Sequence, residues 1–110
     1  MNKINNDPNI NNIFLDWIAT TIFYTALHYN DGFFHTFLNL HPSDHGQRID
    51  ILSREVRKGK YFSKKYFESY KRLMNDSEMA RYQPDLWKSI INRSRISVYI
   101  KDLDIIKNRR

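Results

Sequence analysis

All four histidines of this 110-residue chain lie between Phe23 and Arg48. They are His28, His35, His41 and His45. Imidazole titrates near neutral pH and ligates metal ions, so the cluster could serve catalysis or metal binding. On a continuous helix, His28, Asp31 and His35 would share one face, as weak candidate ligands for a divalent metal. No neighbouring ligand pair reinforces them, and the alternative is hydrogen bonding across helices or to the backbone. We therefore expect no metal or other cofactor.

A second candidate site consists of His41, His45 and Arg48, and its chemistry would be that of a ribonuclease. Cleavage of RNA needs a proton donor or acceptor near the 2′-hydroxyl and a cation near the phosphate. His45 and Arg48 would lie one helical turn apart and could supply both, with His41 as a substitute for His45. The alternative is that both histidines form local hydrogen bonds around a helix start. The sequence leaves open whether the protein is an enzyme.

The excess positive charge of the chain is concentrated between Arg48 and Arg72. This window holds nine basic and three acidic residues, which accounts for the whole net charge of +6. Clustered cations attract phosphate backbones, and the interleaved aromatic residues could stack on bases. The alternative is an ordinary solvated helix face. The predicted nucleic-acid-binding residues are Arg48, Arg54, Lys58, Lys60, Lys64, Lys65, Lys71 and Arg72.

The segment from Ile13 to Leu40 is rich in apolar residues at spacings of three and four, which predicts a helix. The Asp31-Gly32 pair is typical of a turn, but the apolar phase continues through it. We therefore expect one helix over about 13–39, with Gly32 where another helix packs closely. The alternative is a break at 30–32.

Capping signals divide the middle of the chain. Pro42 ends one helix, and Ser43 or Asp44 caps the next, with Gln47 completing a capping box to Asp44. Gly59 is a C-cap, and Ser63 starts an amphipathic helix. The buried stripe of the first helix is predicted to be Ile49, Leu52 and Val56. The apolar face of the second is predicted to be Tyr66, Phe67, Tyr70, Leu73 and Met74.

The last element is predicted to start at Pro84 and Asp85 and to be helical to the end. Helical spacing predicts burial of Leu86, Trp87, Ile90, Ile91, Ile96, Tyr99, Ile100, Leu103 and Ile106. The carboxylates Asp102 and Asp104 are expected to be solvated. The elements predict an all-α fold, a compact up-and-down bundle of four to five helices. It would form a single domain over 13–110, after a flexible segment over 1–12.

Composition points to the reducing cytoplasm. The chain has no cysteine, so disulfides and thiolate zinc sites are excluded. The asparagine-rich N-terminus lacks the apolar run of a secretory signal. The most apolar segment, Ile13 to Leu27, carries Asp16 and is shorter than the ~20 residues of a membrane span. We expect a cytoplasmic protein with no membrane association.

Three segments of the sequence resemble the HEPN superfamily, small helical domains associated with nucleotides or RNA in prokaryotic defence and toxin–antitoxin systems. The segments are "FYTALHY", an "HPxxHxxR" link and "YFESYKRLMNDSEMARY". The resemblance covers about Trp17 to Tyr82. The residues that carry it are Phe23, Tyr24, Ala26, Leu27, His28, His41, Pro42, His45, Arg48, Tyr70, Leu73, Ala80, Arg81 and Tyr82. It implies a helical fold, a homodimer, RNA or a nucleotide as ligand, and a cognate toxin or antitoxin as protein partner.

One departure from the HEPN pattern limits what it implies. Active HEPN ribonucleases carry an arginine followed after four to six residues by a histidine. In this chain the last histidine is His45 and the first arginine is Arg48, so the motif is absent. The expectation is therefore RNA or nucleotide binding through the 48–72 stretch, with atypical or absent ribonuclease activity. The alternative is a small interaction protein, such as an immunity factor or a phage-encoded inhibitor, that docks an acidic partner protein.

Overall fold

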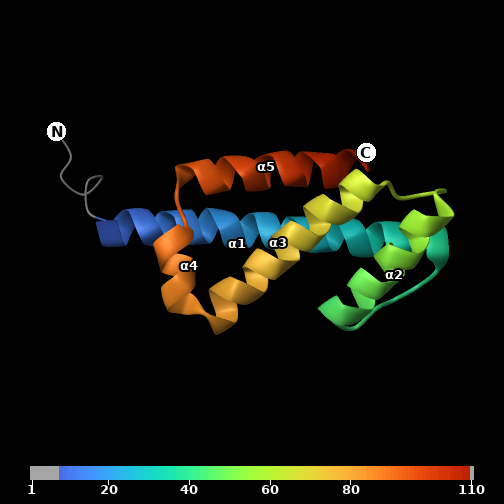
Figure 1. The fold of residues 1–110 in the computed structure, drawn as a ribbon, viewed down its shortest axis with the longest axis horizontal. Coiled ribbons are helices and arrows are strands. Elements are labelled where there is room, and N and C mark those ends of the chain that lie inside the picture. Colours follow the sequence, from blue (N-terminus) through green and yellow to red (C-terminus); the bar gives the residue numbers. More distant parts are fainter. Residues whose placement is uncertain (1–7, 110) are drawn as a thin grey trace.

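The computed structural model describes residues 8–109, which contain no β-strand and form five α-helices and one short π-helix (Figure 1). The elements are α1 (Pro8–Phe33), η2 (Phe34–Leu38), α2 (His45–Lys58), α3 (Lys64–Tyr82), α4 (Pro84–Ile90) and α5 (Arg93–Asn108). The predicted all-α bundle of four to five helices is confirmed. No helix in this part of the chain has both the length and the apolar character that crossing a bilayer requires.

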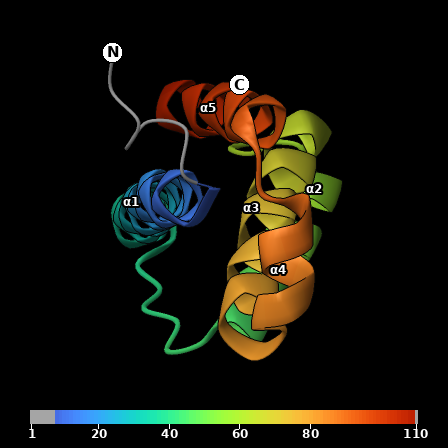
Figure 2. The same cartoon turned by 90° about the vertical axis from the view of Figure 1, so that its left-hand side faces the viewer.

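The long first helix is the axis of the bundle. α1 continues directly into η2, and α5 packs along it in the same direction (Figures 1 and 2). α3 runs back in the opposite direction, with α2 against one half of it and α4 after its end. α2 and α5 both follow the direction of α1, because the link over 39–44 carries the chain back before α2, and α3 carries it back before α4 leads into α5 (Figure 1).

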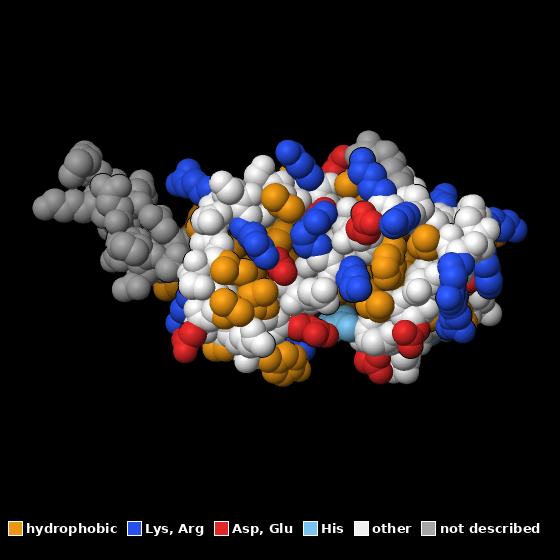
Figure 3. Space-filling view, in the orientation of Figure 1, with side chains coloured by type: hydrophobic (Ala, Val, Ile, Leu, Met, Phe, Trp, Pro, Cys, Tyr) orange, Lys and Arg blue, Asp and Glu red, His pale blue; other side chains and the backbone are white. Residues whose placement is uncertain are grey.

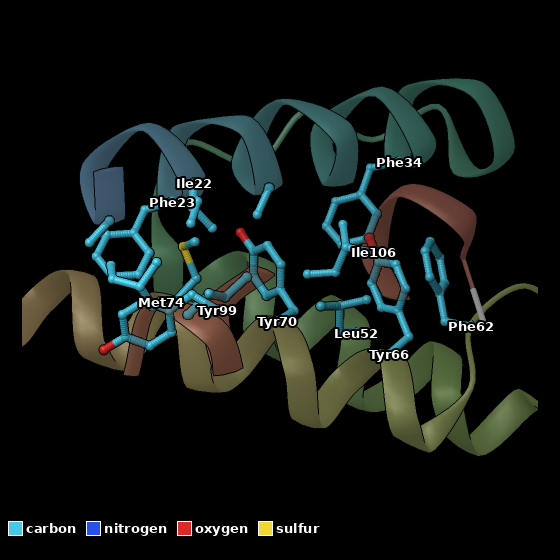
Figure 4. Close-up of a cluster of buried hydrophobic side chains, with 14 of the residues drawn as sticks. Ile22, Phe23, Phe34, Leu52, Phe62, Tyr66, Tyr70, Met74, Tyr99 and Ile106 are labelled. Carbon is cyan, nitrogen blue, oxygen red and sulfur yellow. The ribbon is translucent and has the colours of Figure 1, made fainter. Parts of the chain in front are cut away.

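The core lies between α1 and α3 and is closed by α5 (Figure 4). The Phe34 side chain points from η2 toward Tyr66 of α3, and the Phe23 side chain points from α1 toward Met74 of α3 and Tyr99 of α5. Aromatic contacts join the layers, and the Phe23 and Tyr99 ring centroids are 5.3 Å apart at an interplanar angle of 61°. Each large apolar side chain buried in this way contributes about 1.5–3 kcal/mol to stability. The predicted apolar face of α3 is confirmed, with Phe67 only partly buried.

The predicted caps hold the ends of α2 and α3. Asp44 Oδ1 accepts from the backbone N–H of Gln47 at 2.8 Å, and Ser63 Oγ accepts from that of Tyr66 at 3.1 Å. The Gln47 side chain accepts from the backbone N–H of Ser43 at 2.9 Å, one residue earlier than the predicted box to Asp44. Gly59 adopts φ 70°, the left-handed C-cap that favours glycine. The chain therefore turns tightly between the two helices.

The first helix differs from its prediction at both the start and Gly32. It begins at Pro8 rather than at 13, and proline is favoured at the first helical position because it has no N–H to satisfy. The part of the expected flexible segment over 1–7 lies outside the described residues. The helix passes through 30–32 without a break, as expected. The predicted close packing at Gly32 is wrong, because a Cβ at this position would meet no atom within 4 Å.

The last predicted element is two helices. Ile91 is extended, and Asn92 Oδ1 caps α5 by accepting from the backbone N–H of Arg95 at 2.8 Å. Trp87, Ile91, Ile96, Tyr99 and Ile106 are buried as predicted. The predicted burial of Leu86 and Ile100 is wrong, because their exposed fractions are 48% and 55%. Because the chain is not helical at Ile91 and Asn92, the buried faces of α4 and α5 need not follow one continuous helical phase.

Candidate functional site

Exposed cations gather around the turn between α2 and α3 (Figure 3). We call this area the basic surface. Its residues are Arg54, Arg57, Lys58, Lys60, Lys64, Lys65 and Lys71, all exposed. Gly59 ends α2 and Ser63 starts α3, so the cations of both helices and of their link project near one another. Lys58 Nζ lies 2.9 Å from the Glu55 carboxylate, whereas the other six form no ion pair with any described residue.

Two residues that the sequence assigned to phosphate binding each bond to a carboxylate within the fold. Arg48 donates from Nε and Nη2 to both carboxylate oxygens of Asp31, at 2.8 and 2.9 Å, and its side chain is 11% exposed. Arg72 donates to both oxygens of Asp102 in the same way, at 2.7 and 2.8 Å. These hydrogen bonds raise the pKa of both arginines. The carboxylates therefore take two of the five donors of each guanidinium, and the Arg72 side chain remains 48% exposed. The assignment of Arg48 and Arg72 to nucleic-acid binding stays a prediction.

The same two ion pairs correct the predictions for their acidic partners. Asp102 was expected to be solvated, but it is buried beneath Arg72. Asp31 was a weak candidate for binding metal, but its two oxygens are taken by Arg48. Within residues 8–109, no group of three or more His, Cys, Asp or Glu side chains is placed to hold a metal ion. His28 and His35 are exposed, and they do not form a metal site with Asp31.

The predicted pairing of the candidate catalytic histidines with Arg48 does not form. The ring of His41 lies against that of His35, with centroids 4.9 Å apart. His45 opens α2, and its partner in the predicted site, Arg48, is bonded to Asp31 instead. The Nδ1 atom of His45 is buried and has no hydrogen-bond partner among the described residues. The arrangement therefore leaves one unsatisfied imidazole nitrogen rather than an imidazole–guanidinium pair.

His45 lies on the wall of a pocket of about 270 Å³ between α1, α3 and the start of α2. The lining residues are Asp16, Thr20, Phe23, Tyr24, Leu27, His45, Met74, Ser77, Ala80 and Arg81. Six of them are residues on which the HEPN resemblance depends, and they come from all three of its segments. Asp16 Oδ1 accepts from Trp87 Nε1 at 2.8 Å, which fixes one corner of the pocket. The fold therefore brings the three resembling segments to one place.

Sequence reasoning missed the polar part of this pocket. Asp16, Thr20, Phe23 and Leu27 recur at helical spacing on α1, and this phase was the signal that could have joined them. Ser77 on α3 carries no comparable signal. Nothing local in the sequence shows that α1 and α3 would place these side chains around one pocket.

A stack of aromatic rings lies beside the basic surface. We call Phe33, Phe37 and Tyr61 the aromatic stack. The Phe33 and Phe37 centroids are 6.0 Å apart at 23°, and those of Phe37 and Tyr61 are 5.0 Å apart at 13°. Arg109 Cζ lies 4.5 Å from the Phe37 centroid, and an Nη1 N–H of Arg109 donates to the carbonyl oxygen of Tyr61 at 2.7 Å. Sequence reasoning did not anticipate the part played by Arg109.

Comparison of the chain with protein-family models, with curated proteins and with solved structures gives no match. The HEPN resemblance therefore stays a prediction, and the geometry of the chain itself must carry the functional argument.

Proposed function

We propose that the protein is a HEPN-like RNA-associated protein that binds RNA through the basic surface and does not cleave it. The observation that supports this proposal is the group of six exposed cations that form no ion pair with described residues and surround one tight turn. Cations of this kind release counterions from a phosphate backbone, and that release drives binding. Because they are already solvent-exposed and form no ion pair with described residues, no salt bridge has to break when phosphate binds.

The proposal of binding without cleavage is supported by the absence of the predicted His45–Arg48 pair. A ribonuclease would need a cation beside its proton-transferring group to stabilise charge on the phosphate. Arg48 was the candidate for this role, and its bonds to Asp31 hold it within the fold. The proposal places the protein in a prokaryotic defence or toxin–antitoxin setting, where it would act by binding.

The test is charge reversal on the basic surface with a matched control elsewhere. The variant carries Lys60→Glu and Lys64→Glu, and the control carries Lys88→Glu and Arg93→Glu. All four positions are exposed, and each pair of substitutions changes the net charge equally. Fluorescence anisotropy with a labelled RNA should show a loss of at least about tenfold for the first variant and a much smaller loss for the control.

Salt dependence separates RNA from the alternative partner. The logarithm of the wild-type affinity should fall with the logarithm of salt concentration, by roughly 0.7 for each phosphate contact to single-stranded RNA. An affinity that does not change with salt, or equal losses in the variant and its control, would refute phosphate recognition. That result would favour the docking of an acidic protein, which could be tested by pull-down with the same variants.

A second candidate function is the binding of a free nucleotide in the pocket. The observation that favours it is the unsatisfied Nδ1 of His45 on a wall shared with Tyr24 and Arg81. A base could lie against the Tyr24 ring while Arg81 contacts a phosphate. Titration calorimetry with nucleoside monophosphates should show binding that His45→Ala weakens and His28→Ala does not. If no nucleotide binds the wild type at millimolar concentration, this second function is excluded.

A further inference from the structure

The aromatic stack is held in place from several sides, although its rings are only partly buried. Phe33 is the last residue of α1, Phe37 belongs to η2, and Tyr61 belongs to the link between α2 and α3. Arg109, which follows α5, covers Phe37 and bonds to the Tyr61 backbone. Four separate parts of the chain therefore meet at one group of nearly parallel rings.

Inner and outer aromatic pairs at this end of the molecule differ in their burial. The inner pair, Phe34 and Phe62, is buried, with centroids 5.7 Å apart at 89°. The outer pair, Phe37 and Tyr61, comes from the same two segments but remains partly exposed and stacks at 13°. The inner pair accounts for the packing of η2 against the link. Packing alone gives no reason for a second, parallel pair at the surface.

The π-helix is part of this arrangement. Its wider turn carries Phe34 into the core and Phe37 to the surface within four residues. Short π-helical segments are found frequently at functional sites. Here the segment presents Phe37 to the Tyr61 ring.

A lysine lies against the ring of Tyr61. Phe37 stacks on this ring with centroids 5.0 Å apart, and Lys60 Nζ lies 5.0 Å from its centroid. The ring itself is only partly buried. Lys60 is exposed and belongs to the basic surface, so its flexible side chain can move to a phosphate. A planar base would then take its place and extend the stack by one ring.

We propose that Tyr61, supported by Phe37 and Arg109, is a base-stacking platform, so that the ligand of the basic surface is single-stranded RNA. This inference rests on the proposed RNA binding and adds the class of RNA. A duplex presents phosphates, but its bases stack on one another and their faces are closed to the protein. Only a single strand offers both a backbone to the lysines and an open base face to Tyr61.

The test compares one RNA sequence as a single strand and as a duplex, by fluorescence anisotropy with the full chain. The wild type should bind the single strand more tightly. Tyr61→Leu should lower single-strand affinity by about tenfold, the range for losing one stacked base, and leave duplex affinity unchanged. Tyr61→Phe keeps the ring and should bind like the wild type. The control is Tyr82→Leu, which removes a more exposed tyrosine from the opposite end and should have no effect.

The possible results are distinguishable. Equal binding of single strand and duplex by the wild type would overturn the platform and leave RNA binding intact, and this comparison needs no variant to fold. Equal affinities of Tyr61→Leu and wild type for the single strand would also overturn it. Absence of binding to either RNA would overturn the proposed function as well. A loss confined to the single strand, with unchanged circular dichroism, supports the platform.

Discussion

The basic surface and the opposite end of the bundle expose different kinds of side chain (Figure 3). At one end, cations surround the turn between α2 and α3. At the other, where α1 begins and α4 lies, large apolar side chains face solvent, and Trp17 is 72% exposed. We call this the apolar end. Its residues are Ile13, Phe14, Trp17, Tyr82 and Leu86. The exposed side chains of both ends lie outside the buried core.

The two ends therefore suit partners of different chemistry. Unpaired cations favour an anionic ligand and lose strength with salt, whereas exposed apolar area favours another protein surface. The homodimer expected from the HEPN resemblance stays a prediction, and the apolar end is where we expect it to form. The two functions should therefore be separable by mutation.

The largest expected effect is the loss of folding stability at high pH. It would disrupt the basic surface and the apolar end together, because both depend on the same core. Burial raises the pKa of Tyr66, Tyr70 and Tyr99 above the ordinary value for tyrosine. The unfolded chain releases these protons above about pH 10, while the folded chain retains them. Stability is therefore full below pH 10 and falls as pH rises, by about 4 kcal/mol per pH unit for three groups.

Urea unfolding followed by circular dichroism at pH 9 and pH 11 measures this loss. Equal stability at the two pH values would contradict the burial of these hydroxyl groups, since exposed tyrosines would titrate alike in both states.

A smaller effect distinguishes an arginine that stabilises the fold from one that we expect to bind RNA. Arg48→Ala should destabilise the protein by about 3 kcal/mol, because it leaves Asp31 without its bidentate partner in a partly buried site. Arg54→Ala, on the same helix but exposed, should change stability by less than about 0.5 kcal/mol and should weaken RNA binding instead. Chemical denaturation and anisotropy on both variants measure the contrast. Similar stability losses would mean that Arg48 is not held within the fold.

The smallest expected effect on the fold comes from the apolar end. Trp17→Glu combined with Leu86→Glu should leave stability nearly unchanged, because both side chains are exposed, and should convert a dimer into a monomer. Ile100→Glu, an equally accessible apolar position on α5, is the control and should keep the dimer. Light scattering gives the mass, and RNA binding per chain should persist. A wild type that is monomeric at high concentration would refute the dimer, and a dimer in the double variant would move its interface elsewhere.

Much of the fold follows from local patterns in the sequence, and the particular residues show why. The face of α3 has clear helical spacing, and Asp44, Gly59 and Ser63 cap helices through neighbours within three or four residues. Asn92 offered the same kind of signal for the break before α5, and it was not recognised. These interactions need only short stretches of chain.

The candidate site was predicted less well because its contacts join distant segments. Arg48 was expected at the surface because basic residues surround it in the sequence, but Asp31, from an earlier helix, decides its role. Asp102 likewise determines what Arg72 does. The exposed lysines were placed correctly at the surface, where no distant partner competes for them. Local sequence patterns do not show which residues far apart in the chain will form ion pairs.

The position of α5 against α1 has a consequence for how the protein is made. Phe23 of α1 is covered by Trp87 of α4 and Tyr99 of α5, segments that leave the ribosome only after the rest of the bundle. During translation the apolar face of α1 therefore lacks part of its native cover until α5 emerges, and transiently exposed apolar surface of this kind is prone to aggregation. A nascent chain that stalls before α5 should aggregate or be degraded. The cell therefore obtains a working molecule only when translation passes the last helix of the bundle.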